Sequence, residues 1–119
     1  MEIDLQTISS FFSVLSDETR IKILLYLFKK EHNVNELKEH LGNISLPGVT
    51  YQLNILKENK LIKFQQQGHH RYYSLADTHV LHILSDSIQH LHGGESCDET
   101  LSCLEEHLDL LNEVKIEND

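Results

Sequence analysis

The chain contains few of the residues that crosslink, kink or anchor a protein. Among its 119 residues are two cysteines, one proline and no tryptophan. Cys97 and Cys103, with five residues between them, form neither a disulfide framework nor a CxxC zinc knuckle. The sequence has no run of about 20 apolar residues, and its first residues lack the basic-then-apolar order of a secretion signal. We therefore expect a soluble, cytoplasmic protein with one main domain and no membrane partner.

Basic residues are also scarce, and the net charge of −9 argues at first sight against a nucleic-acid partner. The acids, however, are concentrated in residues 95–119, which hold nine of them against Lys115 alone. The first 94 residues carry a net charge of only −1. We therefore expect a nearly neutral domain over 1–94 and an acidic extension over 95–119, where leucine spacing predicts an amphipathic helix. The domain has one basic patch, formed by Lys57, Lys60, Lys63 and Arg71 with His69 and His70.

Apolar residues at three- and four-residue spacing predict four helices in the first 60 residues. The first covers residues 5–15, and Asp17 is expected to cap the second. The buried face of the second helix is expected to consist of Ile21, Leu24, Leu25 and Phe28. A short third helix ends at Gly42, and Ser45 caps a fourth, with Pro47 in its first turn. The fourth helix buries Val49, Leu53 and Leu56, which leaves a polar outer face of Gly48, Thr50, Tyr51, Asn54 and Lys57.

The third and fourth helices form a predicted helix-turn-helix. An ordinary helical hairpin is the alternative, but residues 61–75 alternate as two strands around Gly68, as a β-hairpin wing does. The predicted fold is mainly α with a small β-hairpin, a winged helix-turn-helix that binds double-stranded DNA. Thr50, Tyr51 and Asn54 are candidates for contacts to base edges. The candidates for phosphate contacts are Ser45, Lys57, Lys60 and Arg71.

A stripe of potential metal ligands follows the wing. Residues 77–92 contain Asp77, His79, His82, Asp86, His90 and His92, and the apolar residues between them repeat with helical spacing. Such histidines can also line a solvated or interface face, which is the alternative interpretation. On one helix His79 and His90 stand roughly 16 Å apart, too far to share a zinc ion with bonds of about 2 Å. Two antiparallel copies could bring these ends together at two equivalent sites, so the stripe indicates a homodimer as well as a metal.

Residues 8–92 together resemble the ArsR/SmtB family of metal-sensing winged-helix repressors. The resemblance is carried, in order, by FFSVLSDETRIKILLYL, NELKEHLG, SLPGVTYQLNILKENKLI, GHHRYYSL and DTHVLHILSDSIQH. It implies a dimer formed through the terminal helices, with zinc bound between the two final helices. The matching ligands are Asp77 and His79 of one subunit and His90 of the other.

The chain departs from the family pattern at the fourth ligand, because that position is Gly93. We assign His92 to this role, with Glu95 or a water molecule as alternatives. The cysteine site that other family members carry on the helix before the recognition helix is missing, which disfavours sensing of soft metals. Imidazole and carboxylate ligands suit zinc, and also cobalt or nickel.

The function predicted on this basis is transcription regulation by a metal-responsive repressor. It would bind operator DNA when metal-free and release the DNA on binding zinc. One alternative is a repressor of the same fold that responds through thiol chemistry at Cys97 and Cys103. Another is a metal-buffering protein without specific DNA binding. An enzyme is not expected, because no nucleophile with an adjacent base and no phosphate loop is present.

Overall fold

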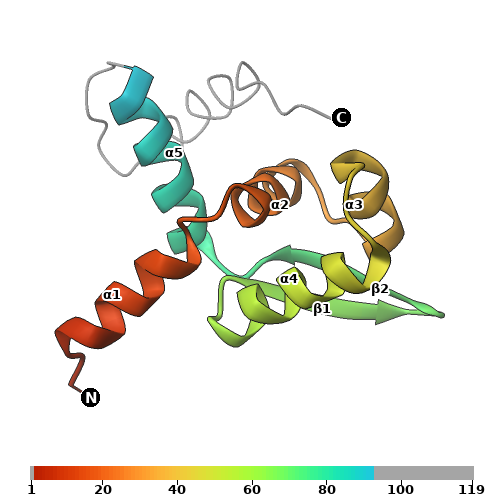
Figure 1. Ribbon diagram of the computed structural model, residues 1–119, viewed down its shortest axis with the longest axis horizontal. Coiled ribbons are helices and arrows are strands. Elements are labelled where there is room, and N and C mark those ends of the chain that lie inside the picture. Colours follow the sequence, from red (N-terminus) through yellow and green to blue (C-terminus); the bar gives the residue numbers. More distant parts are fainter. Residues whose placement is uncertain (1, 93–119) are drawn as a thin grey trace. The chain divides into compact units, whose positions relative to one another are not determined.

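A computed structural model describes residues 2–92, and the predicted helix of the acidic extension, with Cys97 and Cys103, lies outside them. The described part divides into a unit that ends at Ala76 and a unit that begins at Asp77. The first unit contains four helices and a hairpin, and the second contains α5 (Figure 1). The elements are α1 (Leu5–Val14), α2 (Glu18–Lys29), α3 (Val34–Leu41), α4 (Leu46–Glu58), β1 (Ile62–Gln67), β2 (His70–Leu75) and α5 (Thr78–His92).

The helices of the first unit begin at side chains that accept hydrogen bonds from free backbone N–H groups. Asp17 caps α2 by accepting from the backbone of Arg20 at 3.0 Å, and Ser45 caps α4 by accepting from Gly48 at 3.1 Å. A reciprocal capping box between Asn33 and Glu36 begins α3. These caps satisfy donors that a helix leaves unpaired in its first turn, so helix starts could be predicted from sequence.

The core of the first unit is built around α2, which contacts α3, α4 and β2. Leu24 and Leu25 are buried as predicted, whereas Ile21 and Phe28, also expected in the buried face, are half-buried. Burial instead runs through five consecutive residues, from Ile23 to Leu27, because neighbours cover α2 on more than one side. The side chains that are almost completely buried around this helix include Ile23, Leu24, Leu37, Val49, Leu53, Leu56 and Leu61.

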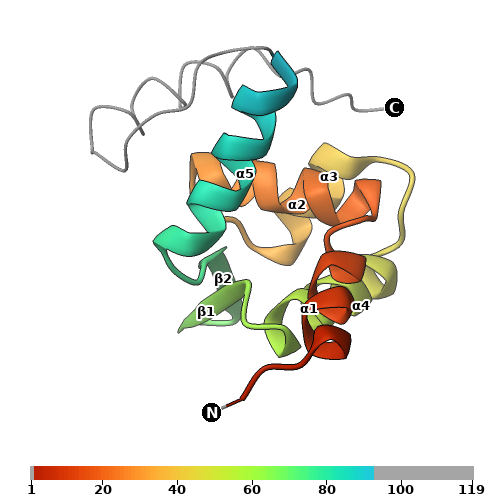
Figure 2. The same ribbon diagram turned by 90° about the vertical axis from the view of Figure 1, so that its left-hand side faces the viewer.

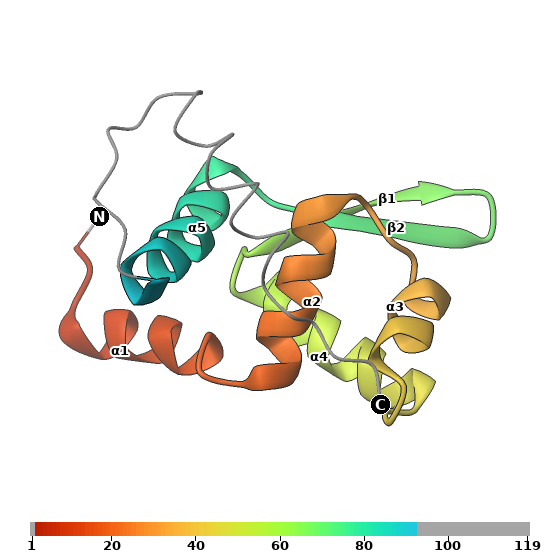
Figure 3. The same ribbon diagram turned by 90° about the horizontal axis from the view of Figure 1, so that it is seen from above.

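The two strands form the predicted antiparallel hairpin, which pairs Ile62 with Leu75 at one end and Gln67 with His70 at the other. Gly68 occupies the turn with a φ of 65°, a conformation that favours glycine. His32 extends this sheet by one bridge: Tyr73 donates its N–H to the carbonyl of His32 at 2.8 Å. Figure 3 shows the hairpin from above, with strands β1 and β2 side by side.

Helix α4 is also tied to the corner between α1 and α2. The Arg20 guanidinium donates from Nε to the carbonyl of Val14 at 2.7 Å and from a terminal nitrogen to Gln52 at 3.0 Å. Figure 2 shows α4 from another side, with the chain passing from its end into β1. Across residues 2–92 no helix is long and apolar enough to cross a membrane.

Candidate functional site

The outer face of α4 carries the side chains predicted to reach DNA bases. Burial of Val49, Leu53 and Leu56 orients the helix, and the positions between them turn outward. Thr50, Tyr51 and Asn54 are all exposed, Tyr51 at 64%. The face therefore presents a hydroxyl, a phenol and an amide, all of which can hydrogen-bond to base edges in a major groove.

Gly48, near the start of this helix, has a packing reason to lack a side chain. A Cβ atom at this position would lie 2.7 Å from Cγ1 of Ile44, in the turn before α4. The side chain of Ile44 therefore occupies the space that a Cβ atom at position 48 would need.

A groove lies between α4, the start of α3 and the hairpin, with a volume of about 430 Å³. It brings together two residues predicted from sequence, Thr50 of the recognition helix and Arg71 of the wing. His69 and His70, which the sequence placed in the basic patch, also line it. The remaining lining residues come from the start of α3 and from the hairpin, and periodicity within one element could not bring them together: Asn33, Val34, Asn35, Gln66 and Tyr73.

The predicted phosphate-binding residues do not all lie together. Lys57 and Arg71 converge, because both place their charged groups over the ring of Phe64. Lys60 instead lines a second hollow, together with residues of α1 and its cap, Asp4. Ser45 stands at the N-terminus of α4, where its Oγ accepts the bond from Gly48 that caps the helix. The N-terminus of a helix favours binding of an anion such as a phosphate. That Ser45 and Lys60 contact DNA stays a prediction.

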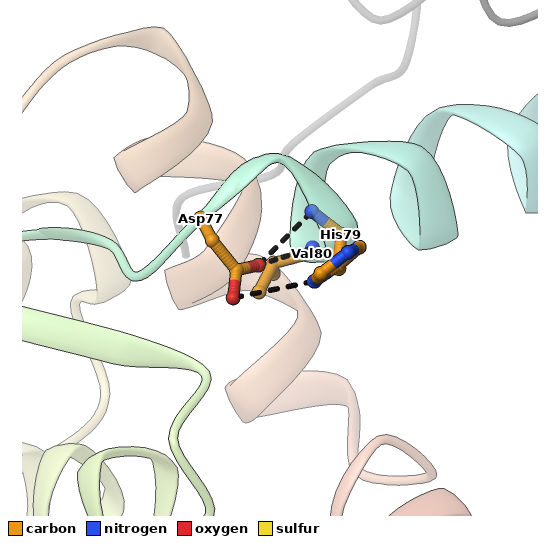
Figure 4. A network of polar contacts seen from close by, with 3 residues as sticks. All are labelled: Asp77, His79 and Val80. Atoms are coloured by element: carbon orange, nitrogen blue, oxygen red, sulfur yellow. Dashed lines mark hydrogen bonds and ion pairs between the residues drawn. The ribbon is translucent and has the colours of Figure 1, made fainter.

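At the start of α5, Asp77 and His79 lie side by side (Figure 4). Oδ1 of Asp77 accepts from the backbone N–H of His79 at 2.9 Å and of Val80 at 3.2 Å, so Asp77 caps the helix. Its other oxygen, Oδ2, faces Nδ1 of His79 at 3.5 Å. The bond from Val80 lowers the pKa of Asp77, so the carboxylate is charged at neutral pH.

These two side chains have the chemistry and the access of metal ligands. The side chain of His79 is 86% exposed and that of Asp77 49% exposed. One carboxylate and one imidazole are a donor pair that zinc accepts, together with further ligands. The donor pair therefore fits the metal implied by the resemblance, but it is only part of a coordination shell.

The rest of the stripe lies further along α5, which is continuous from Thr78 to His92 as predicted. His90 and Asp86 are exposed, and His82 is half-buried. Within residues 2–92 of one chain, no three His, Cys, Asp or Glu side chains are grouped closely enough to hold a metal ion. Glu95, the alternative to His92, falls outside this range.

A cluster of rings at the junction of α2 and α3 could not be found from sequence. His40 stacks on Tyr26 with ring centroids 4.4 Å apart, and His32 meets His40 edge-on at 5.3 Å. His32 is buried, and its Nδ1 bonds the carbonyl of Lys30 at 2.8 Å. Burial lowers the pKa of His32, because the charged imidazolium would lose its hydration. The spacing of these residues follows no sequence motif.

Comparison with known proteins agrees with this architecture. Residues 15–63 match the family model of a helix-turn-helix domain. The transcriptional repressor SmtB homolog of Synechocystis is 35% identical over 72% of this chain, which spans 64% of that relative. The transcriptional repressor SdpR of Bacillus subtilis is 39% identical over 67% of this chain and 83% of its own length.

A solved structure from Mycobacterium bovis shares the fold. It is described as a homodimeric winged helix-turn-helix DNA-binding domain of a possible ArsR-family regulator. It superposes with a TM-score of 0.65 at 20% identity, over 79% of this chain and 90% of that one.

The fold and the outward face of α4 define a winged helix-turn-helix protein of the DNA-binding, non-enzymatic class. Its similarity to named repressors makes the assignment more specific. The chain belongs to the ArsR/SmtB family of transcriptional repressors.

Proposed function

We propose that this protein is a dimeric, metal-responsive repressor that binds its operator when metal-free and releases it on binding zinc. The observation that carries the proposal is the pair formed by Asp77 and His79 at the start of α5. Both side chains are exposed, and they supply one carboxylate and one imidazole on a chain whose relatives are repressors.

The remaining ligands would come from a second copy of the chain. His79 and His90 are separated by about 16 Å along α5, so His90 of the same chain cannot reach the ion. In an antiparallel pair of α5 helices, His90 of the partner subunit would stand next to Asp77 and His79. The M. bovis structure of the same fold is described as homodimeric, which supports a dimer. His92, the last residue of α5, stays our proposal for the fourth ligand.

The DNA side of the mechanism uses the outer face of α4 and the groove beside the wing. Thr50, Tyr51 and Asn54 would contact base edges, and Ser45, Lys57, Lys60 and Arg71 would contact phosphates. In a dimer, the two α4 helices would have to match half-sites about 34 Å apart. The affinity for DNA therefore depends on the spacing and angle between the subunits.

Zinc, when bound, would supply bonds that join α5 of one subunit to α5 of the other. The residues of this chain would then hold the dimer in one arrangement, and operator release follows if that arrangement misplaces the two α4 helices. Such coupling is reciprocal, so the operator must lower the affinity for zinc by the same factor by which zinc lowers the affinity for the operator. Cobalt or nickel would act through the same donors.

The experiment is a fluorescence-anisotropy titration of the protein on DNA from upstream of its own gene, with and without zinc. Two variants serve as reciprocal controls. His79→Ala should bind DNA like the wild type but fail to release it when zinc is added. Asn54→Ala should retain zinc binding while its affinity for the operator falls about tenfold or more, because its amide can no longer hydrogen-bond to a base.

Two results would contradict the proposal in different ways. If specific DNA binding is present but indifferent to zinc, cobalt and nickel, the sensor function is wrong. If zinc binds but no DNA fragment is preferred over random sequence, a metal-buffering function replaces the repressor.

A further inference from the structure

Phe64 on β1 is an aromatic ring on the DNA-binding unit to which two cations from different elements converge. Nζ of Lys57 lies 5.3 Å from the ring centroid and Cζ of Arg71 lies 4.4 Å from it. Both distances are within the range of cation–π attraction. The ring is itself 37% exposed, so the cluster is at the surface.

The strand register explains how Arg71 reaches the ring. Phe64 pairs with Tyr73, and Arg71 pairs with Gln66, two positions further along the same face of the hairpin. Arg71 is therefore the diagonal neighbour of Phe64, within reach of a long side chain. Tyr73 is buried, and its ring lies next to that of Phe64, with the two centroids 5.6 Å apart.

Lys57 arrives from a different element, the last turn of α4. The recognition helix and the wing thus meet at one aromatic side chain. Since both cations lie close to one centroid, they are no more than about 10 Å apart, which is the Debye length at 0.1 M salt. At this distance the two positive charges still repel each other, and the electron-rich face of the ring offsets part of that repulsion.

We infer that Phe64 is a positioning residue for DNA binding, which holds Lys57 and Arg71 as a pair of charges for the phosphate backbone. This inference rests on the proposed function, because it assigns the pair to the same DNA surface. A phosphate group would neutralise the two charges that otherwise repel each other, so the pair favours binding of a polyanion such as DNA. Arg71 also lines the groove beside Thr50, which places the pair at the edge of the surface that would read bases.

The test compares Phe64→Leu with Phe64→Tyr, using anisotropy titrations over a series of salt concentrations. Leucine retains apolar bulk but removes the π face, whereas tyrosine keeps the ring. The affinity of Phe64→Leu should fall by up to about thirtyfold, because the ring no longer holds the two cations in place; the energy of two exposed cation–π interactions sets this upper limit. Its plot of log Kobs against log[salt] should become shallower, by up to about 0.9 for each phosphate that the variant no longer neutralises. Phe64→Tyr should match the wild type in both.

A second comparison separates positioning from a general effect on the wing. In a Lys57→Gln/Arg71→Gln background, Phe64→Leu should cause no further decrease in affinity, because its effect acts through those two cations. Lys63→Gln removes a neighbouring charge that points to the opposite face of the hairpin, and should alter the salt slope less than Lys57→Gln. Thermal melts of every variant identify any loss of folding.

The two proposals fail in distinguishable ways, since each variant is titrated on the upstream fragment and on a random-sequence duplex. An unchanged salt slope in a folded Phe64→Leu variant overturns the positioning role while leaving the repressor intact. Equal losses of affinity in Phe64→Leu and Phe64→Tyr overturn it as well. If the wild type binds both DNAs equally, but the slopes differ as expected, the positioning role stands and specific repression is wrong. Absence of any DNA binding overturns both.

Discussion

The DNA-binding unit and helix α5 differ in whether a single chain supplies all the residues that each proposed function needs. In the unit that ends at Ala76, the core side chains of α4, such as Leu53, orient the face that points to DNA. At the start of α5, Asp77 and His79 are exposed, and their expected co-ligand His90 is a helix length away. A face for reading one DNA half-site can thus be complete in one chain, whereas the proposed metal site would need residues from two.

The largest expected effect is the restoration of a metal site by mixing two inactive variants. His79→Ala and His90→Ala dimers should each bind no zinc at the α5 sites. A mixed dimer, co-expressed with two tags and purified through both, should bind about one zinc, because one of its two sites combines intact residues from both chains. Zinc stoichiometry and competition with a chromophoric chelator measure this. A mixed dimer without zinc would show that the two subunits do not share these ligands and would remove the contrast between the two regions.

A core substitution tests whether α4 is held by its own chain. Leu53→Ala should lower the free energy of unfolding by about 2–5 kcal/mol, because truncating a fully buried side chain leaves a cavity. Tyr51→Ala, on the same helix but 64% exposed, should change it by less than about 0.5 kcal/mol. Urea unfolding followed by circular dichroism measures both. Comparable decreases in the two variants would mean that the orientation of α4 is not set by this core.

Substitution of Asp77 can separate its capping role from its role as a ligand. Asp77→Asn keeps an oxygen that can accept from His79 and Val80 but removes the charge, so zinc affinity should fall by at least about tenfold while the melting temperature of the metal-free protein stays unchanged. Asp77→Ala should lower the melting temperature as well. Zinc competition and thermal melts without metal measure these effects. Full zinc affinity in Asp77→Asn would exclude the carboxylate as a ligand.

The smallest expected effect is a dependence of stability on pH that originates in the DNA-binding unit. The pKa of buried His32 lies below its unfolded value of 6.5, so below this pH the unfolded chain takes up the proton more readily. Stability is therefore fully present above pH 6.5 and is lost as the pH falls toward the folded pKa. His40 and Lys30 oppose the charge on His32, and Glu36 favours it.

The matched variant is His32→Asn, whose amide nitrogen can replace Nδ1 in the bond to the carbonyl of Lys30. Between about pH 7.5 and about pH 5.5, the melting temperature of the wild type should fall more than that of the variant. Differential scanning fluorimetry across this range measures the difference. Parallel pH profiles would show that another group governs the acid sensitivity.

Local interactions account for most of what could be predicted. Asp17 and Ser45 mark helix starts because a capping side chain bonds a backbone N–H three residues away, and Gly68 marks a turn because its φ is positive. The ligand stripe was visible for the same reason, since a helix repeats every 3.6 residues. The family resemblance assigns Asp77, His79 and His90 to a metal on the sequence alone.

Contacts between distant segments could not be predicted in this way. Nothing in the local pattern places Lys57 beside Arg71, because their meeting at Phe64 depends on how α4 packs against the hairpin. The half-burial of Ile21 and Phe28, the burial of His32 and the separation of Lys60 from the groove have the same origin.

The sequence by itself determined the order of helices, the wing, the outward face of α4 and the positions of the candidate ligands on α5. These follow from hydrogen bonds and periodicities that span a few residues. Only the tertiary structure decided which two cations contact the ring of Phe64, which side chains line the groove and which histidine is buried. Those outcomes depend on packing between segments far apart in the chain, where the gain from burying apolar surface selects the neighbours.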